Sequence, residues 1–524
     1  MEFFRLCLKT PSSAREETVF RLAKLVPSDA EGTEAGDIGF IVDAAPDVHR
    51  DSQADNSGCL DPTVAAKRLI NETVQENKPL EARSSFQAVP RTIRSKDSKM
   101  DYFNYKNGKL FAEDVSVDQI AKKVGTPVYI YSKATFIDHL RKINEAYSGL
   151  DTTICYSVKA CGNVNILRFM ADAGSGFDVV SGGELYRVLQ AGGRPSQVVY
   201  AGVGKTDTEI VEALDAGIGY FNIESEAELE NLIRLASQRG KQAKVALRVN
   251  PDVDYKTHAF ITTGKKETKF GVDIERAMKV FADYGDNRAV NLCALHVHLG
   301  SGGKKIDPYV EAVEKILPLI DRLRDKGHMI EAVDLGGGYG ADYESDTVPS
   351  AVEYAAGIVP LLKNKDVRLI LEPGKSICAN AGILLTRVLY IKHGGSKKFV
   401  IADAGMNDLI RPSLYDAFHF IWPAKVDEKF AAHKRTKDLK PEGAETVDVV
   451  GPICEGADFF ARDRALPPTK RGDLLCVFTA GAYGFTMSSN YNARPRAAEV
   501  LVDAGEFCVI SRREAYEDLI ALEK

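Results

Sequence analysis

The sequence predicts an α/β protein: a (β/α)8 barrel of the TIM type, then a mainly β C-terminal domain (a sandwich or barrel), with a largely disordered N-terminal extension. Between residues 127 and 375, short apolar segments alternate with segments of helical length. About eight such strand–helix units indicate a parallel barrel. After residue 375, β-branched segments separated by turn residues indicate a β domain. An open doubly wound sheet is the alternative, but no Gly-x-Gly-x-x-Gly follows the first predicted strand.

The first 98 residues differ from the rest of the chain. Residues 43–98 are rich in Asp, Ser, Asn, Gln and Arg and poor in large apolar side chains, which predicts a low-order extension over residues 1–98. Residues 1–9 could begin a targeting peptide, but acidic residues soon follow, and the apolar run is too short for a secretory signal. We therefore predict a cytoplasmic protein, with a plastid as the alternative if the extension is a transit peptide.

Residues 101–126 are predicted to join the C-terminal domain, which otherwise takes residues 376–524. Asn107-Gly108 is a hairpin signal, and it predicts a hairpin over 103–111, followed by a helix over 116–124. The strands predicted in the barrel region, 127–375, are 128–131, 153–158, 177–181, 197–201, 220–223, 243–250, 292–299, 332–335 and 368–371. The helices predicted between them are 133–147, 164–173, 183–191, 207–216, 226–239, 274–284, 308–326 and 351–362. The strands predicted in the C-terminal domain are 383–391, 398–402, 446–450, 473–479 and 507–511.

Composition argues for a globular protein and against several classes of partner. Of the 524 residues, 44% are hydrophobic and 27% are charged, and the net charge is −6, so we predict no nucleic-acid partner. No apolar run approaches the roughly 20 residues that a membrane-spanning helix needs, so we predict no membrane partner. The nine cysteines are odd in number and never spaced as Cys-x-x-Cys, which argues against a disulfide framework and a zinc cluster.

The predicted chemistry is organised around Lys159. Residues 152–158 are largely β-branched and aromatic and run straight into this lysine, and residues 161–163 turn the chain behind it. A lysine at the C-terminal end of a strand lies on the face where barrels carry their chemistry. Its amine can form a Schiff base once its surroundings lower its pKa. Taken alone, a solvated lysine at a strand end is the simpler interpretation.

Two later strand ends carry groups that suit a phosphorylated cofactor. A glycine turn, Gly336 to Gly338, follows an apolar strand, and such turns let backbone N–H groups approach a phosphate. A turn needed only for chain reversal is an equal alternative. Glu372 ends the next strand, before Gly374. A carboxylate at that depth needs a cationic partner, and a protonated pyridine nitrogen is one.

A histidine pair ends another predicted strand. His296 and His298 lie two residues apart and therefore face the same side of that strand. No acidic or thiol side chain is adjacent in the sequence, so we predict no metal site. An imidazole there can stack on a flat cofactor ring, and Ser301 can donate to a phosphate. A structural histidine is the alternative.

The C-terminal domain adds three motifs. Cys454 stands beside acidic side chains, Glu455 among them; a thiol can donate a proton and a carboxylate can bind an ammonium group. A buried cysteine with surface acids is the alternative. Arg411, four residues before Tyr415, offers a guanidinium fork suited to a carboxylate. Tyr483 is flanked by glycines in Gly481–Gly484.

In this order, the motifs resemble those of the fold-type III pyridoxal-phosphate decarboxylases, or group IV decarboxylases, and most closely the diaminopimelate decarboxylase branch. The resemblance covers about residues 101–524. The motifs that carry it are Tyr156–Ala160, Phe177–Glu184, His296–Ser301, Gly336–Gly340, Glu372–Gly374, Arg411–Tyr415, Cys454–Asp458 and Gly481–Tyr483.

The resemblance implies that Lys159 holds pyridoxal 5′-phosphate covalently through its amine and that Glu372 pairs with the ring nitrogen. The other cofactor-binding residues that it implies are His298, Ser301, Gly336, Gly337, Gly338, Gly374 and Tyr483. It also implies that Cys454 is the catalytic proton donor and reaches into the active site of the other subunit, so that a homodimer shares its active sites. The implied substrate-binding residues are Lys375, Arg411, Tyr415, Glu455 and Tyr483.

The reaction implied by the resemblance is the decarboxylation of an amino-acid substrate, meso-2,6-diaminopimelate, to L-lysine and CO2, the last step of lysine biosynthesis. One alternative is a related decarboxylase acting on ornithine, arginine or carboxynorspermidine, which would not need Arg411. Another is a regulatory homologue without catalysis, against which Lys159, Glu372 and Cys454 argue. Lys375 stands where the family usually has arginine, and lysine keeps the charge but loses the bidentate fork.

Overall fold

The computed structural model describes residues 100–253, 269–300, 303, 305–345, 347–432 and 434–523. The extension expected over residues 1–98 lies outside the described residues. The barrel and the C-terminal domain fall in one compact unit.

Eight parallel strands close into a barrel, because β8 pairs with β9 and β13 pairs with β5. These strands are β5 (Thr152–Ser157), β6 (Gly176–Val179), β7 (Val198–Tyr200), β8 (Tyr220–Ile223), β9 (Ala243–Asn250), β11 (Val290–His296), β12 (Ala332–Asp334) and β13 (Arg368–Leu371). Most of their residues are buried, as expected of parallel strands that are covered on both faces. The predicted barrel is confirmed, and the open doubly wound sheet is excluded. A two-residue strand, β10 (Val272–Asp273), extends the pairing of β9.

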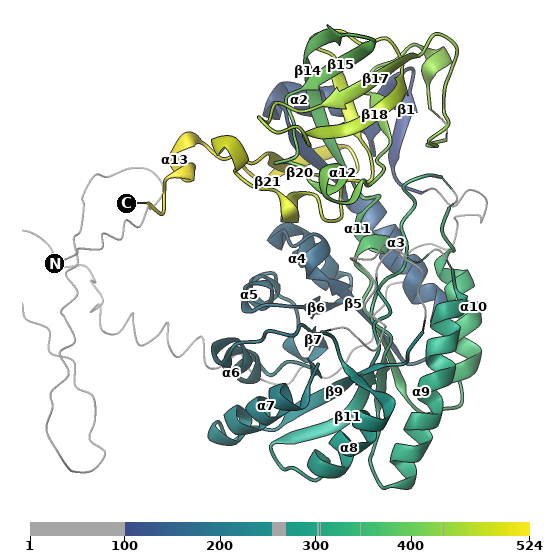
Figure 1. Cartoon of the computed structure of the whole chain (residues 1–524), viewed down its shortest axis with the longest axis vertical. Helices are drawn as coiled ribbons and strands as arrows, with labels where there is room; N and C mark the ends of the chain where they lie inside the picture. The colour runs from purple at the N-terminus through teal and green to yellow at the C-terminus, as the bar shows by residue number, and fades with distance from the viewer. Residues whose placement is uncertain are drawn as a thin grey trace, which may run out of the picture. The chain divides into compact units, whose positions relative to one another are not determined.

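Helices cover the outside of the barrel (Figure 1). Seven of them follow barrel strands: α4 (Val164–Asp172), α5 (Gly182–Gln190), α6 (Asp207–Ala216), α7 (Glu226–Gln238), α8 (Ile274–Tyr284), α9 (Asp307–Asp325) and α10 (Ala351–Leu362). Thr206 and Ser350 begin α6 and α10 with capping boxes, which satisfy backbone N–H groups that a helix start leaves open. The remaining place is taken by α3 (Lys133–Ala146), which contacts α10, β5 and the short α11 (Lys375–Cys378).

The C-terminal domain is built on a second sheet, with the path β18-β17-β15-β14-β4-β20-β21 and with β16 and β19 paired beside β14. Its strands after the barrel are β14 (Gly382–Gly394), β15 (Lys397–Ala402), β16 (Ile421–Pro423), β17 (Glu445–Val450), β18 (Phe459–Leu466), β19 (Leu474–Val477), β20 (Ala498–Asp503) and β21 (Glu506–Ser511). The predicted β domain is confirmed, although β16, β18 and β20 were not among the predicted strands.

The first strand predicted for the barrel belongs to this second sheet instead. β4 (Val128–Ser132) is antiparallel to β14 and parallel to β20, and it makes no pair with a barrel strand. All five of its residues are buried, so its continuous apolar run is typical of a central strand in either sheet. The expected start of the barrel at residue 127 is therefore corrected: the barrel's first element is α3, at Lys133.

The N-terminal hairpin packs against the C-terminal domain. β1 (Phe103–Lys106) and β2 (Lys109–Ala112) are joined by Asn107 and Gly108, whose φ angles of 51° and 70° suit a type I′ turn, so the predicted hairpin is confirmed. The Leu110 amide donates to the Ala424 carbonyl at 2.8 Å, and the Tyr105 hydroxyl donates to the Pro423 carbonyl at 2.6 Å. β3 (Val115–Ser116) and α2 (Val117–Val124) follow.

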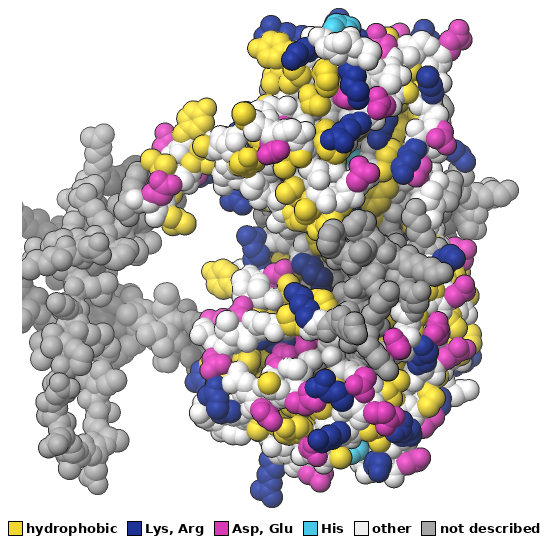
Figure 2. All heavy atoms as spheres, viewed as in Figure 1, with side chains coloured by type: hydrophobic (Ala, Val, Ile, Leu, Met, Phe, Trp, Pro, Cys, Tyr) yellow, Lys and Arg dark blue, Asp and Glu magenta, His cyan; other side chains and the backbone are white. Residues whose placement is uncertain are grey.

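The surface carries charges of both signs. On the face shown in Figure 2, lysine and arginine side chains are interspersed with acidic ones, and the described part of that face has no continuous basic area. Of the helices within the described ranges, none has the length and apolar character needed to cross a bilayer.

Candidate active site

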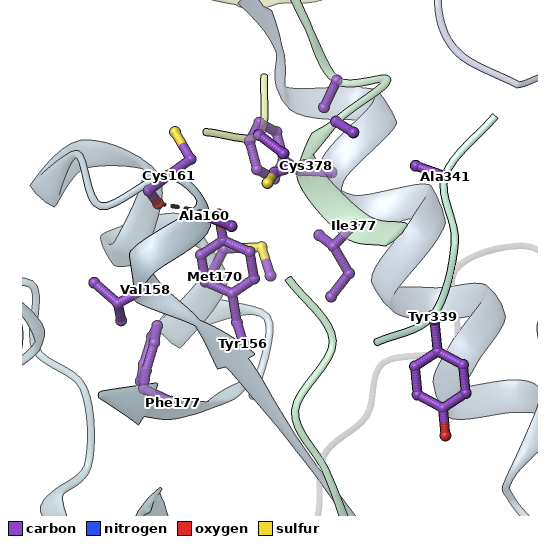
Figure 3. Close-up of a cluster of buried hydrophobic side chains, with 14 of the residues drawn as sticks. Tyr156, Val158, Ala160, Cys161, Met170, Phe177, Tyr339, Ala341, Ile377 and Cys378 are labelled. Atoms are coloured by element: carbon purple, nitrogen blue, oxygen red, sulfur yellow. Dashed lines mark hydrogen bonds between the residues drawn. The ribbon is translucent and has the colours of Figure 1, made fainter. Parts of the chain in front are cut away.

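Lys159 lies at the carboxyl end of β5, in a single 3-10 turn over Val158–Ala160. Val158 and Ala160 are buried, and Figure 3 shows them in the apolar cluster around Tyr156. The Tyr156 hydroxyl donates to the Cys161 carbonyl at 3.0 Å, which bridges the turn. The backbone is thus held in place, while the Lys159 side chain remains 32% exposed.

Asp178 is the direct partner of Lys159. The Lys159 ammonium donates to Asp178 Oδ2 at 2.5 Å, and the Ser157 hydroxyl donates to the same oxygen at 2.6 Å. Burial opposes the charge on Lys159, but the carboxylates of Asp178 and Glu372 outweigh it and raise the pKa of Lys159. Asp178 Oδ1 is buried and has no hydrogen-bond partner among the described residues.

Glu372 follows β13 and is 2% exposed. Asn222, on β8, donates from its Nδ2 to Glu372 Oε1 at 3.1 Å and to Asp334 Oδ2 at 3.1 Å. Burial would raise the pKa of Glu372, but His296 and Lys159 hold it below its usual value. For Asp334, burial and the neighbouring Glu372 raise the pKa well above its usual value.

The two histidines at the end of β11 both approach Glu372. His296 Nε2 lies 3.7 Å and His298 Nδ1 lies 4.0 Å from Glu372 Oε2. No acidic side chain is adjacent to this pair in the sequence, but Glu372, just after β13, supplies one in space. Burial and the nearby Arg248 lower the pKa of His298, so its ring is neutral near pH 7. The prediction that the site holds no metal stays a prediction.

The glycine turn after β12 is packed too closely to accept side chains. A Cβ atom on Gly337 would lie 2.3 Å from the Glu372 carbonyl oxygen, and one on Gly338 would lie 2.0 Å from the Gly300 carbonyl oxygen. Gly336 and Gly338 also have φ angles of 65° and 91°, which favour glycine. The Gly337 amide donates to His298 Nδ1 at 3.2 Å, so the turn touches the histidine directly.

Residues from α11 and the C-terminal domain approach the same side of the barrel as Lys159. The Tyr483 amide donates to the Ala160 carbonyl at 2.8 Å, which ties this loop to the Lys159 turn. The Lys375 ammonium lies 5.8 Å from the centre of the Tyr483 ring. Burial, helped by the charge of Arg411, lowers the pKa of Lys375 to about 8.

Arg411 begins α12 (Arg411–Tyr415) and is 7% exposed. Its guanidinium donates to the Tyr343 hydroxyl and lies 3.3 Å from His419 Nε2. Burial and Arg411 lower the pKa of His419 to about 3, so this imidazole is neutral and can accept a hydrogen bond from the arginine. Both partners of the guanidinium are neutral, so its positive charge has no carboxylate partner among the described residues.

Comparisons with known proteins agree with this geometry. Residues 133–379 match the family model for the pyridoxal binding domain of pyridoxal-dependent decarboxylases. The diaminopimelate decarboxylase of Pseudomonas aeruginosa is 46% identical over 424 residues, which cover 81% of this chain and 99% of that protein. The chain belongs to the diaminopimelate decarboxylase family. A crystal structure of diaminopimelate decarboxylase from Helicobacter pylori complexed with L-lysine has a TM-score of 0.72 and 38% identity, covering 78% of this chain and 99% of that one. The enzyme from M. jannaschii has a TM-score of 0.75 at 38% identity, covering 81% and 98%.

Most of the predicted cofactor-binding residues of this diaminopimelate decarboxylase lie close together. Direct hydrogen bonds, short ion-pair distances and close packing join Lys159, Glu372, His298, the glycine turn and Gly374 around the carboxyl ends of β5, β11, β12 and β13. Gly374 packs directly against the Lys159 turn, where a Cβ atom would lie 2.9 Å from Ser157 Cβ. Ser301 lies outside the described residues.

Cys454 and Glu455 are exposed, on a loop of the C-terminal domain. The Cys454 amide donates to Asn492 Oδ1 at 2.7 Å. Within the described ranges, no hydrogen bond or ion pair joins Cys454 or Glu455 to Lys159, Asp178 or Glu372 of the same chain. Tyr415 is half-buried at the end of α12, one turn beyond Arg411.

Sequence reasoning missed several buried polar residues of this diaminopimelate decarboxylase site. They are Asp178, Asn222, Arg248, Asp334 and His419, together with the partly buried Tyr343. Asp178 lies within β6 and Asp334 ends β12, and both strands are otherwise apolar. An acidic residue in an apolar strand is a signal that the sequence already contained. The roles of Asn222 and His419 depend on neighbours from other parts of the chain, which a single sequence does not reveal.

Proposed function

We propose that this chain is a pyridoxal-phosphate-dependent carboxy-lyase that converts meso-2,6-diaminopimelate to L-lysine and CO2, the last step of lysine biosynthesis. The observation that carries the proposal is Lys159 at the barrel mouth, which forms an ion pair with the buried Asp178 and lies close to the buried Glu372. The chain also aligns with a diaminopimelate decarboxylase over nearly the whole length of that protein. The L-lysine in the H. pylori structure is the product of that reaction.

The residues present fit the cofactor. Several buried polar atoms at the barrel mouth have no hydrogen-bond partner among the described residues: Asp178 Oδ1, Asn222 Oδ1 and both ring nitrogens of His296. Buried polar atoms without partners are uncommon in folded proteins and are expected where a polar ligand binds. The glycine turn would offer a phosphate a surface without side chains.

In this proposal, Lys159 would hold the cofactor covalently through its amine. Glu372, which is buried and ionised, keeps the ring nitrogen protonated. His298 has a neutral ring that can stack on the cofactor without adding charge. Gly336 to Gly338 and Gly374, together with Ser301, bind the phosphate. When bound, the cofactor supplies an electron sink for the pair of electrons left behind as CO2 departs.

In this proposal, charged side chains of the protein bind the substrate. Arg411 is buried with a free positive charge, which suits the distal carboxylate of diaminopimelate. Lys375 and Tyr483 lie between Arg411 and Lys159 and would line the path to the reacting carbon, with Tyr483 also touching the cofactor. Tyr415 and Glu455 complete the proposed set, with Glu455 binding the distal ammonium group.

The proton returned to the α-carbon comes, in this proposal, from the Sγ atom of Cys454. Because Cys454 and Glu455 are exposed and not joined to the Lys159 group of their own chain, we propose that they complete the site of a second subunit. The enzyme would then be a homodimer with two shared active sites. We place it in the cytoplasm, or in a plastid if residues 1–98 act as a transit peptide.

The deciding experiment measures CO2 release from meso-diaminopimelate by the wild type and by Lys159→Ala, with and without added pyridoxal phosphate. We expect release that depends on the cofactor and is lost in the variant. Equal release by both proteins would show that Lys159 is not the cofactor-binding residue. Ornithine is the control substrate: it has no distal carboxylate for Arg411, and faster turnover of ornithine would favour the related decarboxylases.

A further inference from the structure

The mouth of the barrel contains more buried acid than buried base. Asp178, Asp334 and Glu372 are all at most 2% exposed. Lys159 is bound to Asp178, and Arg248, the other buried cation nearby, is paired with Glu224 at 2.8 Å. Within the described part of the chain, no lysine or arginine forms an ion pair with Asp334 or Glu372.

One amide joins the two remaining carboxyl groups. The two N–H bonds of Asn222 Nδ2 point to Glu372 Oε1 and Asp334 Oδ2, each at 3.1 Å. The other oxygen of Asp334, Oδ1, accepts from the Gly336 amide at 2.8 Å, so this carboxyl is fixed to the glycine turn. Because one amide nitrogen binds an oxygen of each, the carboxyl groups of Asp334 and Glu372 are neighbours.

Two carboxyl groups in such contact, away from water, cannot both carry charge at low cost, and such pairs share one proton. The groups that face the pair are His296 from β11, His298 just after it, Cys155 from β5, Lys159 from the turn after β5, and Asp178 from β6. The histidines and Lys159 lie on the Glu372 side, where they favour its ionised form. Asp334 has only amide donors and the Glu372 carboxylate, and burial raises its pKa accordingly.

We propose that Asp334 is a positioning residue that keeps the proton of the Asp334–Glu372 pair and donates it in a hydrogen bond to Glu372. Glu372 is then the only charged member of the pair, and Asn222 and Asp334 fix its orientation toward the cofactor ring. This role for Glu372 rests on the proposed function, whereas the protonation of Asp334 does not.

The first test needs no cofactor. A protonated carboxyl group has a carbonyl stretching band in the infrared that is separate from the bands of a carboxylate. We expect the difference spectrum between wild type and Asp334→Asn at pH 7 to show the loss of one such band. Asp207→Asn, which removes an exposed carboxylate bound to Arg234, should show no such loss. If Asp334→Asn also shows none, Asp334 is ionised and the proposal fails.

The second test measures cofactor binding to purified full-length protein. Asp334→Ala removes the donor to Glu372, and we expect pyridoxal phosphate to bind about tenfold more weakly or worse. Asp334→Asn can still donate to Glu372 and accept from Gly336, but its amide nitrogen cannot accept from Asn222, so we expect a loss of affinity that is smaller than that of Asp334→Ala. In Asp334→Ala the absorbance of bound cofactor should also titrate at a different pH, whereas in Asp334→Asn it should follow the wild type.

The outcomes separate the two proposals. Equal weakening in Asp334→Asn and Asp334→Ala would show that the donated proton is not what Asp334 provides. Wild-type protein that binds no pyridoxal phosphate would overturn the proposed function, while the infrared result would still decide the protonation of Asp334. If Asp334→Ala does not fold, the infrared comparison with Asp334→Asn remains decisive.

Discussion

Lys375 is a proposed substrate-binding residue whose charge should change between pH 7 and pH 9. Its pKa is lowered to about 8 in the protein, so it is mostly charged at pH 7 and mostly neutral at pH 9. If it binds a substrate carboxylate, KM for diaminopimelate should rise about tenfold between these pH values, as the charged fraction falls. Lys375→Arg keeps its charge over this range and should remove most of that rise. Identical pH profiles for the two proteins would exclude a substrate-binding charge at this position.

The Lys159–Asp178 pair gives a second prediction at the scale of residues. Asp178→Asn removes a carboxylate that raises the pKa of Lys159 and leaves burial, which lowers it. In cofactor-free protein, we expect reductive methylation of Lys159 to begin at a pH about one unit lower or more. Mass spectrometry of the labelled peptide measures the midpoint.

Asp207→Asn is the matched control for that measurement, because its exposed carboxylate binds only Arg234 and Asn231 among the described side chains, and its loss should leave the Lys159 midpoint in place. An unchanged midpoint in Asp178→Asn would show that Asp178 does not set the charge of Lys159.

Most of the site residues could be proposed from the sequence because each ends a recognisable strand. Lys159, His298 and Glu372 follow apolar runs, and a barrel brings the carboxyl ends of its strands together. The Asn222 bridge could not be foreseen, because its meaning depends on two carboxyl groups that approach from other strands. The expectation for Cys454 rests on the family resemblance alone, and its place in the site of a second subunit stays a prediction.

Among structural elements, the glycine turn after β12 makes the sharpest demand on its sequence. Gly338→Ala would place a Cβ atom 2.0 Å from the Gly300 carbonyl oxygen, at a φ of 91°. We expect a loss of about 1–3 kcal/mol in the free energy of unfolding and weaker cofactor binding. Gly204→Ala is the control, since no atom lies within 4 Å of its added Cβ, and it should change stability by less than about 0.5 kcal/mol. Urea unfolding curves compare the two, and equal curves would contradict the packing argument.

The helices of the barrel matched their predicted ranges closely because they have amphipathic spacing and, except for α9, a capping side chain at the start. α6 and α10, with their capping boxes, are examples. Short strands of the C-terminal domain were harder to find. β16 has only three residues and contains Trp422 and Pro423, and β18 carries charged side chains along much of its length, so neither has the alternating pattern of a strand. Their pairing with distant strands decides their conformation.

At the scale of the whole molecule, the proposed dimer predicts complementation between inactive variants. Lys159→Ala lacks the proposed cofactor-binding amine, and Cys454→Ala lacks the proposed proton donor. If each site combines Lys159 of one subunit with Cys454 of the other, half of randomly mixed dimers are heterodimers, each with one intact site. Mixing should therefore restore about a quarter of wild-type activity. No recovery, with exchange of subunits shown separately, would place both residues in the same chain's site.

The placement of β4 constrains how the chain can be made. Its two neighbours in the sheet, β14 and β20, both come from the part of the sequence after the barrel. During synthesis on a ribosome, β4 emerges before the barrel. Both of its edges stay unpaired until β14 and β20 have been synthesised. A gene fragment that stops after the barrel would leave it without a partner, so we expect such a truncated product to aggregate rather than accumulate as a separate barrel.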